Sequence, residues 1–225
     1  EASNRELEAF SYSVSHDLRA PLRAIDGFAQ IVSEDYAPRL DETGREYLQR
    51  IRIATQRMAR LIDDLIDLAR LTRQTMKREE VNLSQIVDQI LTELRQEDPA
   101  RHIEAHVEPN LMAAADRALI RVALENLLRN AWKFTSRRDV AQIQFHAEMR
   151  ERQIVYCVTD NGAGFDMSFA SKLFLPFHRL HGISEFAGTG IGLATVQRVI
   201  QRHEGRVWAE SAPEKGASFY FTLSH

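Results

Sequence analysis

The sequence predicts two parts of different fold class, an α-helical hairpin followed by an α+β sandwich. Three observations support this division. Up to residue 68, apolar residues recur every three or four positions, which is the spacing of packed helices. From about residue 83, helical patterns alternate with short β-branched strands. Between them lies the charged run Lys77-Arg78-Glu79-Glu80. We therefore expect a helical part over residues 1–76, a linker over 77–82 and an α+β part over 83–225.

The first part is expected to contain two long amphipathic helices, over about residues 4–36 and 47–68, with a break at Pro38. The second helix has two neighbouring apolar seams. One seam comprises Tyr47, Ile51, Ala54, Met58, Leu61, Leu65 and Leu68, and the other comprises Leu48, Thr55, Ile62, Ile66 and Ala69. A helix with two seams faces more than one partner, and a lone hairpin has too small a core to be stable. Two chains are therefore expected to pair into a dimeric four-helix bundle.

The second part is expected to be an antiparallel or mixed sheet covered by helices. Strands are expected over 103–108, 111–114, 142–149, 154–159, 206–210 and 218–223, and helices over 84–95, 117–135 and 193–203. Ser84 and Asp116 are the expected N-caps of the first two helices. Gly205 is the expected C-cap of the third, and a turn is expected over 213–216.

Composition excludes several classes of function. A net charge of −3 and a pI near 6.3 argue against a nucleic-acid surface, which needs a concentrated positive field. Cys157 is the only cysteine, so the chain has no internal disulfide or cysteine zinc cluster, and a reducing, cytoplasmic location is expected. No apolar run approaches the roughly 20 residues that span a bilayer. The chain begins within a helical pattern, so an upstream sensory segment is expected.

The first helix offers a candidate nucleophile in the run Ser15-His16-Asp17-Leu18-Arg19-Ala20-Pro21. His16 lies opposite the midpoint of Val14 and Leu18, so it is expected to point to solvent. Asp17 could accept the Nδ1 proton, which would leave the Nε2 lone pair for attack on phosphorus. Pro21 is expected to bend the helix. Taken alone, such a pair is more often a surface histidine beside an acid.

Three further motifs are typical of a nucleotide pocket. In Asn126-Leu127-Leu128-Arg129-Asn130-Ala131-Trp132-Lys133, the residues Asn126, Asn130 and Lys133 share one helix face. Amide oxygens can complete a magnesium shell, and a lysine can neutralise phosphate. Two asparagines on a solvated helix face are an equally common explanation of this motif when it stands alone.

The second motif is Asp160-Asn161-Gly162-Ala163-Gly164, at the end of an apolar strand. The carboxylate of Asp160 can accept the amino proton of adenine but would repel the carbonyl oxygen of guanine, so it favours ATP over GTP. A plain β-turn is the alternative explanation for the Asp-Asn-Gly sequence.

The third motif is Gly188-Thr189-Gly190-Ile191-Gly192-Leu193, just before a helix. Bare backbone amides and the helix N-terminus can approach a triphosphate here. The pattern is neither a P-loop nor a Rossmann fingerprint. The preceding segment is expected to be a mobile lid from which Arg179 reaches the phosphates, with Phe174 and Phe177 packing at the base of the lid.

Together these motifs resemble those of the two-component sensor histidine kinases, over nearly the whole chain. Residues 16–21 resemble the H box, 126–133 the N box, 160–164 the first glycine box, 174–179 the F box and 188–193 the second glycine box. The resemblance implies a dimerisation and histidine-phosphotransfer hairpin followed by a Bergerat-type (GHKL) ATP-binding domain. Residues 10–23 further resemble kinases attached to PAS or phytochrome-like sensors.

The resemblance also implies roles for individual residues. His16 would be phosphorylated, Asn130 with Asn126 nearby would hold Mg²⁺, and Asp160 would read the adenine of ATP. The partners implied are a second copy of the chain and a response regulator whose aspartate takes the phosphoryl group. Ala20 departs from relatives that also dephosphorylate their regulator, because these usually carry Thr or Asn there. Ala20→Thr is therefore expected to raise regulator dephosphorylation.

Two other functions are alternatives to this one. A related ATPase, such as a chaperone, a topoisomerase subunit or an anti-sigma-type serine kinase, would not need an exposed His-Asp pair on a heptad helix. A dimeric adaptor that binds nucleotide without turnover would not need intact Asn130, Asp160 and glycine loops.

The remaining unusual residues are expected to be structural. His102, His106, His178 and His181 lack the partners of a metal site, and His203 is expected to complement a helix dipole. Trp132, Trp208 and Cys157 are expected to be packing residues.

Overall fold

The computed structural model describes residues 2–71, 76–178, 180, 186 and 188–224, with side chains in the first two helices described from Leu18 to Ile66. The chain divides into two compact units, residues 1–73 and 74–225. Within the described residues, no helix is both long enough and apolar enough to cross a bilayer.

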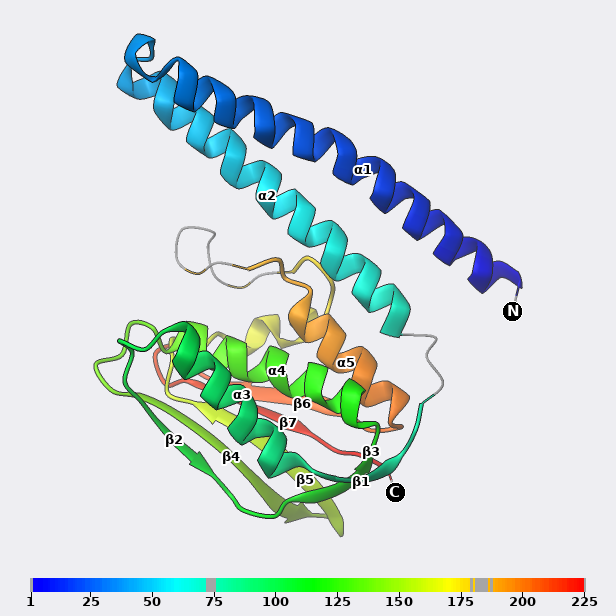
Figure 1. The fold of residues 1–225 in the computed structure, drawn as a ribbon. Helices are drawn as coiled ribbons and strands as arrows, with labels where there is room; N and C mark the ends of the chain where they lie inside the picture. The colour runs from blue at the N-terminus through cyan, green and yellow to red at the C-terminus, as the bar shows by residue number, and fades with distance from the viewer. Residues whose placement is uncertain (1, 72–75, 179, 181–185, 187, 225) are drawn as a thin grey trace. The chain divides into compact units, whose positions relative to one another are not determined.

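The first unit is a helical hairpin (Figure 1). Helix α1 (Ala2–Asp35) is joined by a short 3-10 turn, η1 (Ala37–Arg39), to helix α2 (Glu42–Leu71). Pro21 lies inside α1 and does not end it. The core of the hairpin contains Leu22 of α1 with Ile62 and Ile66 of α2. An ion pair between Arg52 and Asp26, at 3.3 Å, also joins the two helices.

The two apolar seams of α2 have different surroundings. Thr55, Ile62 and Ile66 of one seam are buried. The other seam is open to solvent in the single chain: Tyr47, Ile51, Met58 and Leu65 are 43–58% exposed. On α1, Ile25 and Phe28 are exposed in the same way. Among the described residues, the hairpin therefore buries one apolar stripe between its helices and leaves a second exposed.

The second unit contains a mixed five-stranded sheet in the order β2-β4-β5-β7-β6. Its strands are β2 (Ile103–Val107), β4 (Ala141–Arg150), β5 (Gln153–Asp160), β6 (Val207–Ser211) and β7 (Ala217–Phe221). Strand β2 is parallel to β4, and the other pairs are antiparallel. Alternate residues such as Ile143 and Phe145 are buried, as period-two strands require.

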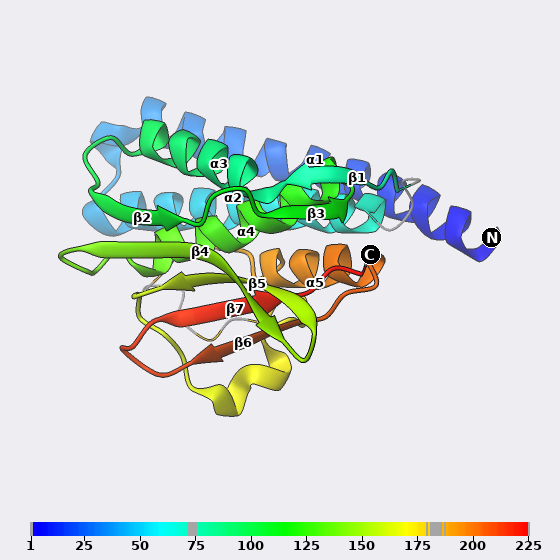
Figure 2. The ribbon, with the colours of Figure 1, turned by 90° about the horizontal axis from the view of Figure 1, so that it is seen from below.

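Three helices cover one face of this sheet, as Figures 1 and 2 show. They are α3 (Leu83–Glu97), α4 (Arg117–Phe134) and α5 (Gly192–Arg202). The main core lies between their apolar sides and the buried strand residues, and includes Leu124, Leu128, Val199 and Phe221. The expected helical region followed by an α+β sheet domain is therefore confirmed. A short helix, η2 (Met167–Lys172), follows the first glycine motif.

Part of the expected linker is a strand. Residues Glu79–Asn82 form β1, which pairs antiparallel with β3 (Met112–Ala115) in a separate two-stranded sheet. The sequence does not predict this strand, because its first two residues are charged and exposed. Val81, however, is 1% exposed. This one buried side chain and the backbone pairing attach the segment to the second unit.

The N-cap expected for α3 is wrong by two residues. Asn82 is the cap, and its side chain accepts a hydrogen bond from Gln85 N at 3.1 Å. Ser84 lies within the helix, where its hydroxyl donates to Glu108 O at 2.6 Å and accepts from Leu111 N at 3.0 Å. Ser84 thus joins α3 to the loop between β2 and β3. The cap at Asp116 is confirmed, because its carboxylate accepts from Ala118 N and Leu119 N.

Candidate active site

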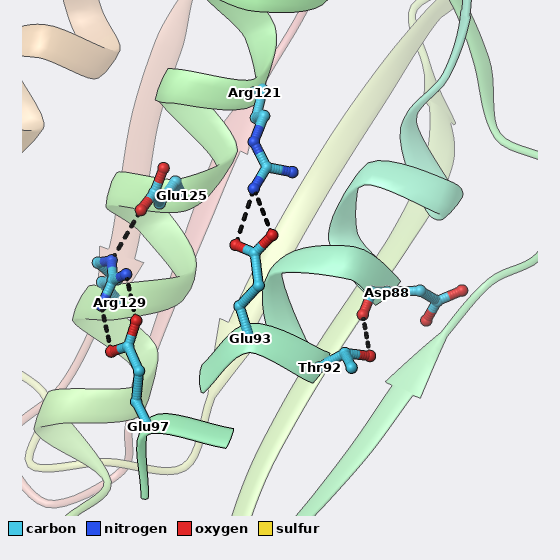
Figure 3. Close-up of polar contacts among 7 residues, drawn as sticks. All are labelled: Asp88, Thr92, Glu93, Glu97, Arg121, Glu125 and Arg129. Atoms are coloured by element: carbon cyan, nitrogen blue, oxygen red, sulfur yellow. Dashed lines mark hydrogen bonds and ion pairs between the residues drawn. The ribbon is translucent and has the colours of Figure 1, made fainter. Parts of the chain in front are cut away.

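Helix α4 carries Asn126, Asn130 and Lys133, and ion pairs to α3 hold it in place (Figure 3). Arg121 contacts both carboxylate oxygens of Glu93, at 2.7 and 2.8 Å. Arg129 contacts both oxygens of Glu97 at 2.8 Å and also Glu125 on its own helix. The Arg129–Glu97 pair has two parallel hydrogen bonds, which restrict rotation as well as separation. These ion pairs hold α4 by a face different from the one that carries the asparagines.

The amide groups on α4 are held by neighbouring atoms. Asn126 Nδ2 donates to Val122 O at 2.9 Å, which fixes the orientation of its amide. Lys133 Nζ donates to Asn130 Oδ1 at 3.2 Å and lies 4.2 Å from the centre of the Phe134 ring. The three side chains are half-buried. They form a polar row of two amides and one cation on α4.

The second glycine motif lies against this row. A Cβ atom at Gly192 would be only 2.6 Å from Asn126 Oδ1, so only glycine fits there without displacing the asparagine. A Cβ atom at Gly188 would lie 3.3 Å from Lys133 Nζ. Gly190 has φ +82° and accepts a hydrogen bond from Phe177 N at 3.0 Å. The structure therefore brings Gly188 and Gly192 beside the residues of α4.

Within the described residues, the N-cap residue of α5 makes no side-chain capping hydrogen bond. Residue Ile191 occupies the N-cap position and makes no side-chain hydrogen bond, whereas Asn82 and Asp116 cap α3 and α4. Uncapped first-turn N–H groups leave a partial positive charge that suits an anion. Leu193 is half-buried in this first turn. The uncapped helix end therefore lies next to Asn126, where a phosphate would be expected.

Asp160 ends strand β5 and is 5% exposed. Its Oδ1 accepts a hydrogen bond from Gly162 N at 2.8 Å. Burial raises the pKa of this carboxyl to about 6, even though hydrogen bonds from the backbone amides of Gly162 and Ala217 and the charge of Arg138 act in the opposite direction. A nearly buried carboxyl group that is held by backbone amides is well suited to read a hydrogen-bond donor.

The first glycine motif is attached to the end of α4. A Cβ atom at Gly162 would lie 2.7 Å from both Asp160 Oδ1 and the Phe134 carbonyl oxygen, so a side chain does not fit. Ala163 N donates to Phe134 O at 3.1 Å. Gly164 has φ +62° and packs on the backbone of Ala212. Asp160 and the α4 residues therefore belong to one continuous arrangement.

Arg138 is a residue of this arrangement that the sequence analysis missed. Its guanidinium group donates to the carbonyl oxygens of Asn161, Gly162 and Glu214, at 2.8, 2.8 and 2.7 Å. All three acceptors are backbone atoms, and the last lies 76 residues away in the sequence. The only available signal was an arginine soon after the helix, and that signal is not specific.

The segment before the second glycine motif is described only in part. Arg179, expected to reach the phosphates, and His181 lie outside the described residues. Phe174 is half-buried, but Phe177 is 55% exposed, so the expectation that both phenylalanines pack is wrong for Phe177. Phe186 is buried instead and makes an edge-to-face contact with Phe134, with ring centres 4.9 Å apart.

The candidate nucleophile is in the other unit. His16 and Asp17 lie in α1, but their side chains are outside the described part of the structure. The outward orientation expected for the His16 imidazole therefore stays a prediction. Nearby, Leu18 and Ala20 are exposed, and Arg19 hydrogen-bonds to Asp63 of α2.

The residues present fit magnesium bound together with phosphate. Among the described residues, no group of three or more His, Cys, Asp or Glu side chains could hold a metal alone. Magnesium usually binds through a few protein oxygens, substrate phosphates and water. The amide oxygens of Asn126 and Asn130 beside the uncapped end of α5 match that donor set.

His203 is the C-cap residue of α5. It is fully buried; its Nε2 accepts from Asp116 N at 3.0 Å and its Nδ1 lies 2.8 Å from Val199 O, to which it donates. Burial lowers the pKa of this imidazole, and the charges of Arg78 and Arg202 act in the same direction. A neutral ring does not complement the helix dipole by its charge, but its Nδ1–H donates to a carbonyl oxygen in the last turn of α5. His203 also joins the end of α5 to the start of α4.

The other packing residues behave as expected. Trp132 and Cys157 are buried, and burial raises the pKa of the Cys157 thiol. Trp208 stacks on Tyr220 with ring centres 5.4 Å apart.

Two family models match the chain. Residues 6–74 match the His Kinase A (phospho-acceptor) domain, and residues 115–225 match the histidine kinase-, DNA gyrase B- and HSP90-like ATPase. The first match covers most of the first compact unit and ends one residue beyond it, and the second lies within the second unit and contains the whole of α4, both glycine motifs and Asp160.

Curated relatives match over almost the whole chain. The phytochrome-like protein Cph1 of Synechocystis is 33% identical over 99% of this chain and 30% of its own length. The methanogenesis regulatory histidine kinase FilI of Methanothrix harundinacea is 35% identical over 99% of this chain and 25% of its own length. The chain thus spans less than a third of either relative. The crystal structure of full-length ShkA in complex with AMPPNP shares the fold, with a TM-score of 0.65 and 23% identity over 96% of this chain and 45% of that chain.

Proposed function

Because the chain belongs to the two-component sensor histidine kinases, we propose that it transfers the γ-phosphoryl group of ATP to His16 and then to an aspartate of a response regulator. The observation that carries the proposal is the grouping in one unit of the buried Asp160, the amides of Asn126 and Asn130, and the uncapped N-terminus of α5. These groups match the adenine, the magnesium ion and the phosphates of one nucleotide.

In this proposal the protein groups bind and orient ATP. Asp160 accepts the amino proton of adenine, and the N–H groups of α5 and the ammonium of Lys133 face phosphate oxygens. Asn126 and Asn130 hold magnesium, which when bound neutralises phosphate charge. Gly162, Gly164, Gly188 and Gly190 let the backbone approach the nucleotide, Leu193 contacts it from the first turn of α5, and Arg179 adds a further cation.

The phosphoryl transfer itself is a displacement at the γ-phosphorus. The Nε2 lone pair of His16 forms the new N–P bond while the bond to the bridging oxygen of ADP breaks and ADP leaves. Asp17 accepts the proton of Nδ1, which keeps the phosphorylated imidazole neutral. Positioning and charge neutralisation supply most of the catalysis, as is general for phosphoryl transfer.

The proposal includes a homodimer, a cytoplasmic location and an upstream sensor. The exposed seam of α2 supports the dimer, because a second hairpin would cover it and complete a four-helix bundle. One buried cysteine is consistent with a reducing compartment. The similarity to a phytochrome-like relative supports a sensory domain as the source of the signal.

Incubation with γ-labelled ATP and Mg²⁺ tests the proposed activity. We expect label on the wild-type chain that resists alkali and is lost in acid, as a phosphohistidine is, and that can be chased onto a receiver domain. His16→Gln should abolish the label while ATP binding is unchanged.

Two variants separate the kinase from its alternatives. Asn130→Asp should abolish both labelling and magnesium-dependent nucleotide binding, whereas His106→Gln, on an exposed strand position, should change neither. Label that persists in His16→Gln would contradict the site assignment. ATP hydrolysis without labelled protein would instead favour an ATPase of the wider superfamily, and binding without turnover would favour an adaptor.

A further inference from the structure

Arg138 lies just beyond α4 and is held close to the end of that helix. Thr135 is the C-cap of α4, and Arg138 N donates to Thr135 O at 3.0 Å. The side chain is 30% exposed, so most of it is shielded from water. Its position is therefore set by the same helix that carries Asn126, Asn130 and Lys133.

The guanidinium group of Arg138 joins two loops that are distant in sequence. Nε donates to Asn161 O and Nη2 to Gly162 O, both in the first glycine motif. Nη2 also donates to Glu214 O and pairs with the Glu214 carboxylate at 3.1 Å. Glu214 lies in the β6–β7 turn, has φ +63°, and donates through its N–H to Ala163 O at 2.7 Å. Arg138 thus connects the end of α4, the first glycine motif and the β6–β7 turn.

One of these contacts acts directly on Asp160. The carbonyl of Asn161 and the N–H of Gly162 belong to the same peptide unit, which is planar and rigid. Arg138 Nε holds the carbonyl end of this unit at 2.8 Å, and Asp160 Oδ1 accepts from its N–H end, also at 2.8 Å. A rotation of the plane would break both hydrogen bonds. The Asp160 carboxylate also accepts a hydrogen bond from the backbone amide of Ala217, but its bond to Gly162 N couples its orientation to Arg138 through one rigid group.

We propose that Arg138 is a positioning residue for base selection: by fixing the Asn161–Gly162 peptide plane it sets which Asp160 oxygen remains available to the amino group of adenine. This inference rests on the proposed function of Asp160. The positive charge of Arg138 also favours the ionised carboxylate, which is the better acceptor. Lysine could supply that charge, but it could not supply the planar fork that reaches neighbouring carbonyls.

The test compares two nucleotides that differ only at the group Asp160 reads. Affinities of the full chain for ATP and for purine riboside triphosphate, which lacks the exocyclic amino group, are measured by calorimetry in the wild type, Arg138→Lys and Arg138→Met. We expect both variants to lose about tenfold or more in ATP affinity. The affinity for the purine analogue should change by less than about threefold, so the preference for ATP should collapse.

Three controls make the test specific. Arg150→Met removes an arginine that contacts Glu148, Glu210 and the Tyr220 ring. Arg150 lies at the opposite end of the β4–β5 pair from Asp160, so this variant should leave both affinities unchanged. In an Asp160→Asn background, Arg138→Met should have little further effect on ATP affinity. In Arg138→Met alone, the pH at which ATP affinity falls should move upward, whereas Arg138→Lys should keep the wild-type midpoint.

Three results of these affinity measurements would contradict different parts of the proposal. Equal loss for both nucleotides, with a lower melting temperature, would overturn the proposal in favour of a merely structural role for Arg138. Unchanged ATP affinity in both variants would overturn it as well. If the wild type itself fails to prefer ATP over the analogue, the assigned role of Asp160 fails first, and the proposed function is what has been contradicted.

Discussion

Asp160 is a residue whose burial reduces stability. An isolated carboxyl group titrates near 3.8, but burial raises the pKa of Asp160 to about 6. Between these values the unfolded chain is ionised while the folded chain retains its proton, so the stability of the second unit decreases as the pH rises through this window. Above pH 6 the full cost of the buried carboxylate is present. A residue kept at such a cost is expected to serve binding rather than folding.

Asp160→Asn should therefore separate stability from nucleotide binding. Relative to the wild type, the variant's free energy of unfolding should rise by up to about 3 kcal/mol between pH 4 and pH 7, because asparagine has no charge to bury. Urea denaturation followed by tryptophan fluorescence measures this, since Trp132 and Trp208 both lie in the second unit. ATP affinity should fall. If the difference in free energy of unfolding between the variant and the wild type did not change with pH, the raised pKa of Asp160 would be contradicted.

Gly192 offers a second test at the residue scale. An alanine in the first turn of α5 suits helix formation, so Gly192→Ala should leave stability unchanged or slightly higher. Its Cβ would lie 2.6 Å from Asn126 Oδ1, however, so the asparagine must move. We expect about a tenfold or greater loss of magnesium-dependent ATP affinity.

The matched control for this variant is Gly27→Ala. Gly27 is a glycine of α1 whose added Cβ would have no neighbour within 4 Å. The Gly27→Ala substitution should raise the stability of the helix by up to about 1 kcal/mol without affecting nucleotide affinity. A Gly192→Ala variant that binds ATP as tightly as the wild type would contradict the placement of Asn126 at the magnesium site.

Sequence reasoning located the elements better than the contacts between them. Apolar periodicity and cap residues are local properties, so the helices and strands of both units and the cap at Asp116 could be predicted. Strand β1 and the true cap of α3 could not, because a four-residue strand with two charged residues has no clear pattern. Arg138 could not be assigned either, since its acceptors are backbone carbonyls brought near by the fold.

His203 shows how two helices are joined at their ends. The C-cap residue of α5 accepts a hydrogen bond from the N-cap residue of α4, and Asp116 in turn accepts from Lys77 N at 2.9 Å. Arg78 pairs with Glu204 at 3.1 Å on the same side. The segment that leads into β1 is therefore attached to the start of α4 and the end of α5, the two helices that carry the candidate site.

This junction should make stability sensitive to acid. The pKa of His203 lies below the ordinary 6.5 in the folded state, so below pH 6.5 the unfolded chain takes up a proton that the folded chain does not. His203→Leu should cost about 1–3 kcal/mol at pH 7.5, because Asp116 N loses its acceptor. That cost should shrink as the pH falls toward 5.

Urea denaturation at the two pH values measures the effect, with His106→Gln as a control at an exposed position. A cost that stays constant between pH 7.5 and pH 5 would contradict the lowered pKa of His203. As the pH falls through the acidic range, His203 lowers the stability of the wild type, whereas Asp160 raises it. The difference in stability between each variant and the wild type is therefore more informative than the wild-type pH profile alone.

At the scale of the whole molecule, the hairpin is incomplete as a single chain. Its internal core is small, while Tyr47, Ile51, Met58 and Leu65 line up on α2 in contact with solvent. An exposed apolar stripe of this length normally marks an interface. Steps of four and seven between its members are those of a bundle seam, so a second hairpin is the partner that fits its spacing.

Met58→Glu should dissociate the dimer that we propose. The side chain is 50% exposed in the single chain and lies in the middle of the exposed seam, where a dimer would bury it. An unpaired carboxylate there should raise the dimer dissociation constant by at least about a hundredfold, which corresponds to about 3 kcal/mol. Sedimentation velocity over a concentration series measures this.

Gln49→Glu, which adds the same charge at an exposed position on the opposite side of α2, should leave the dimer intact. ATP binding should survive in both variants, because the nucleotide groups all lie in the second unit. A Met58→Glu chain that remains dimeric would show that another surface forms the interface.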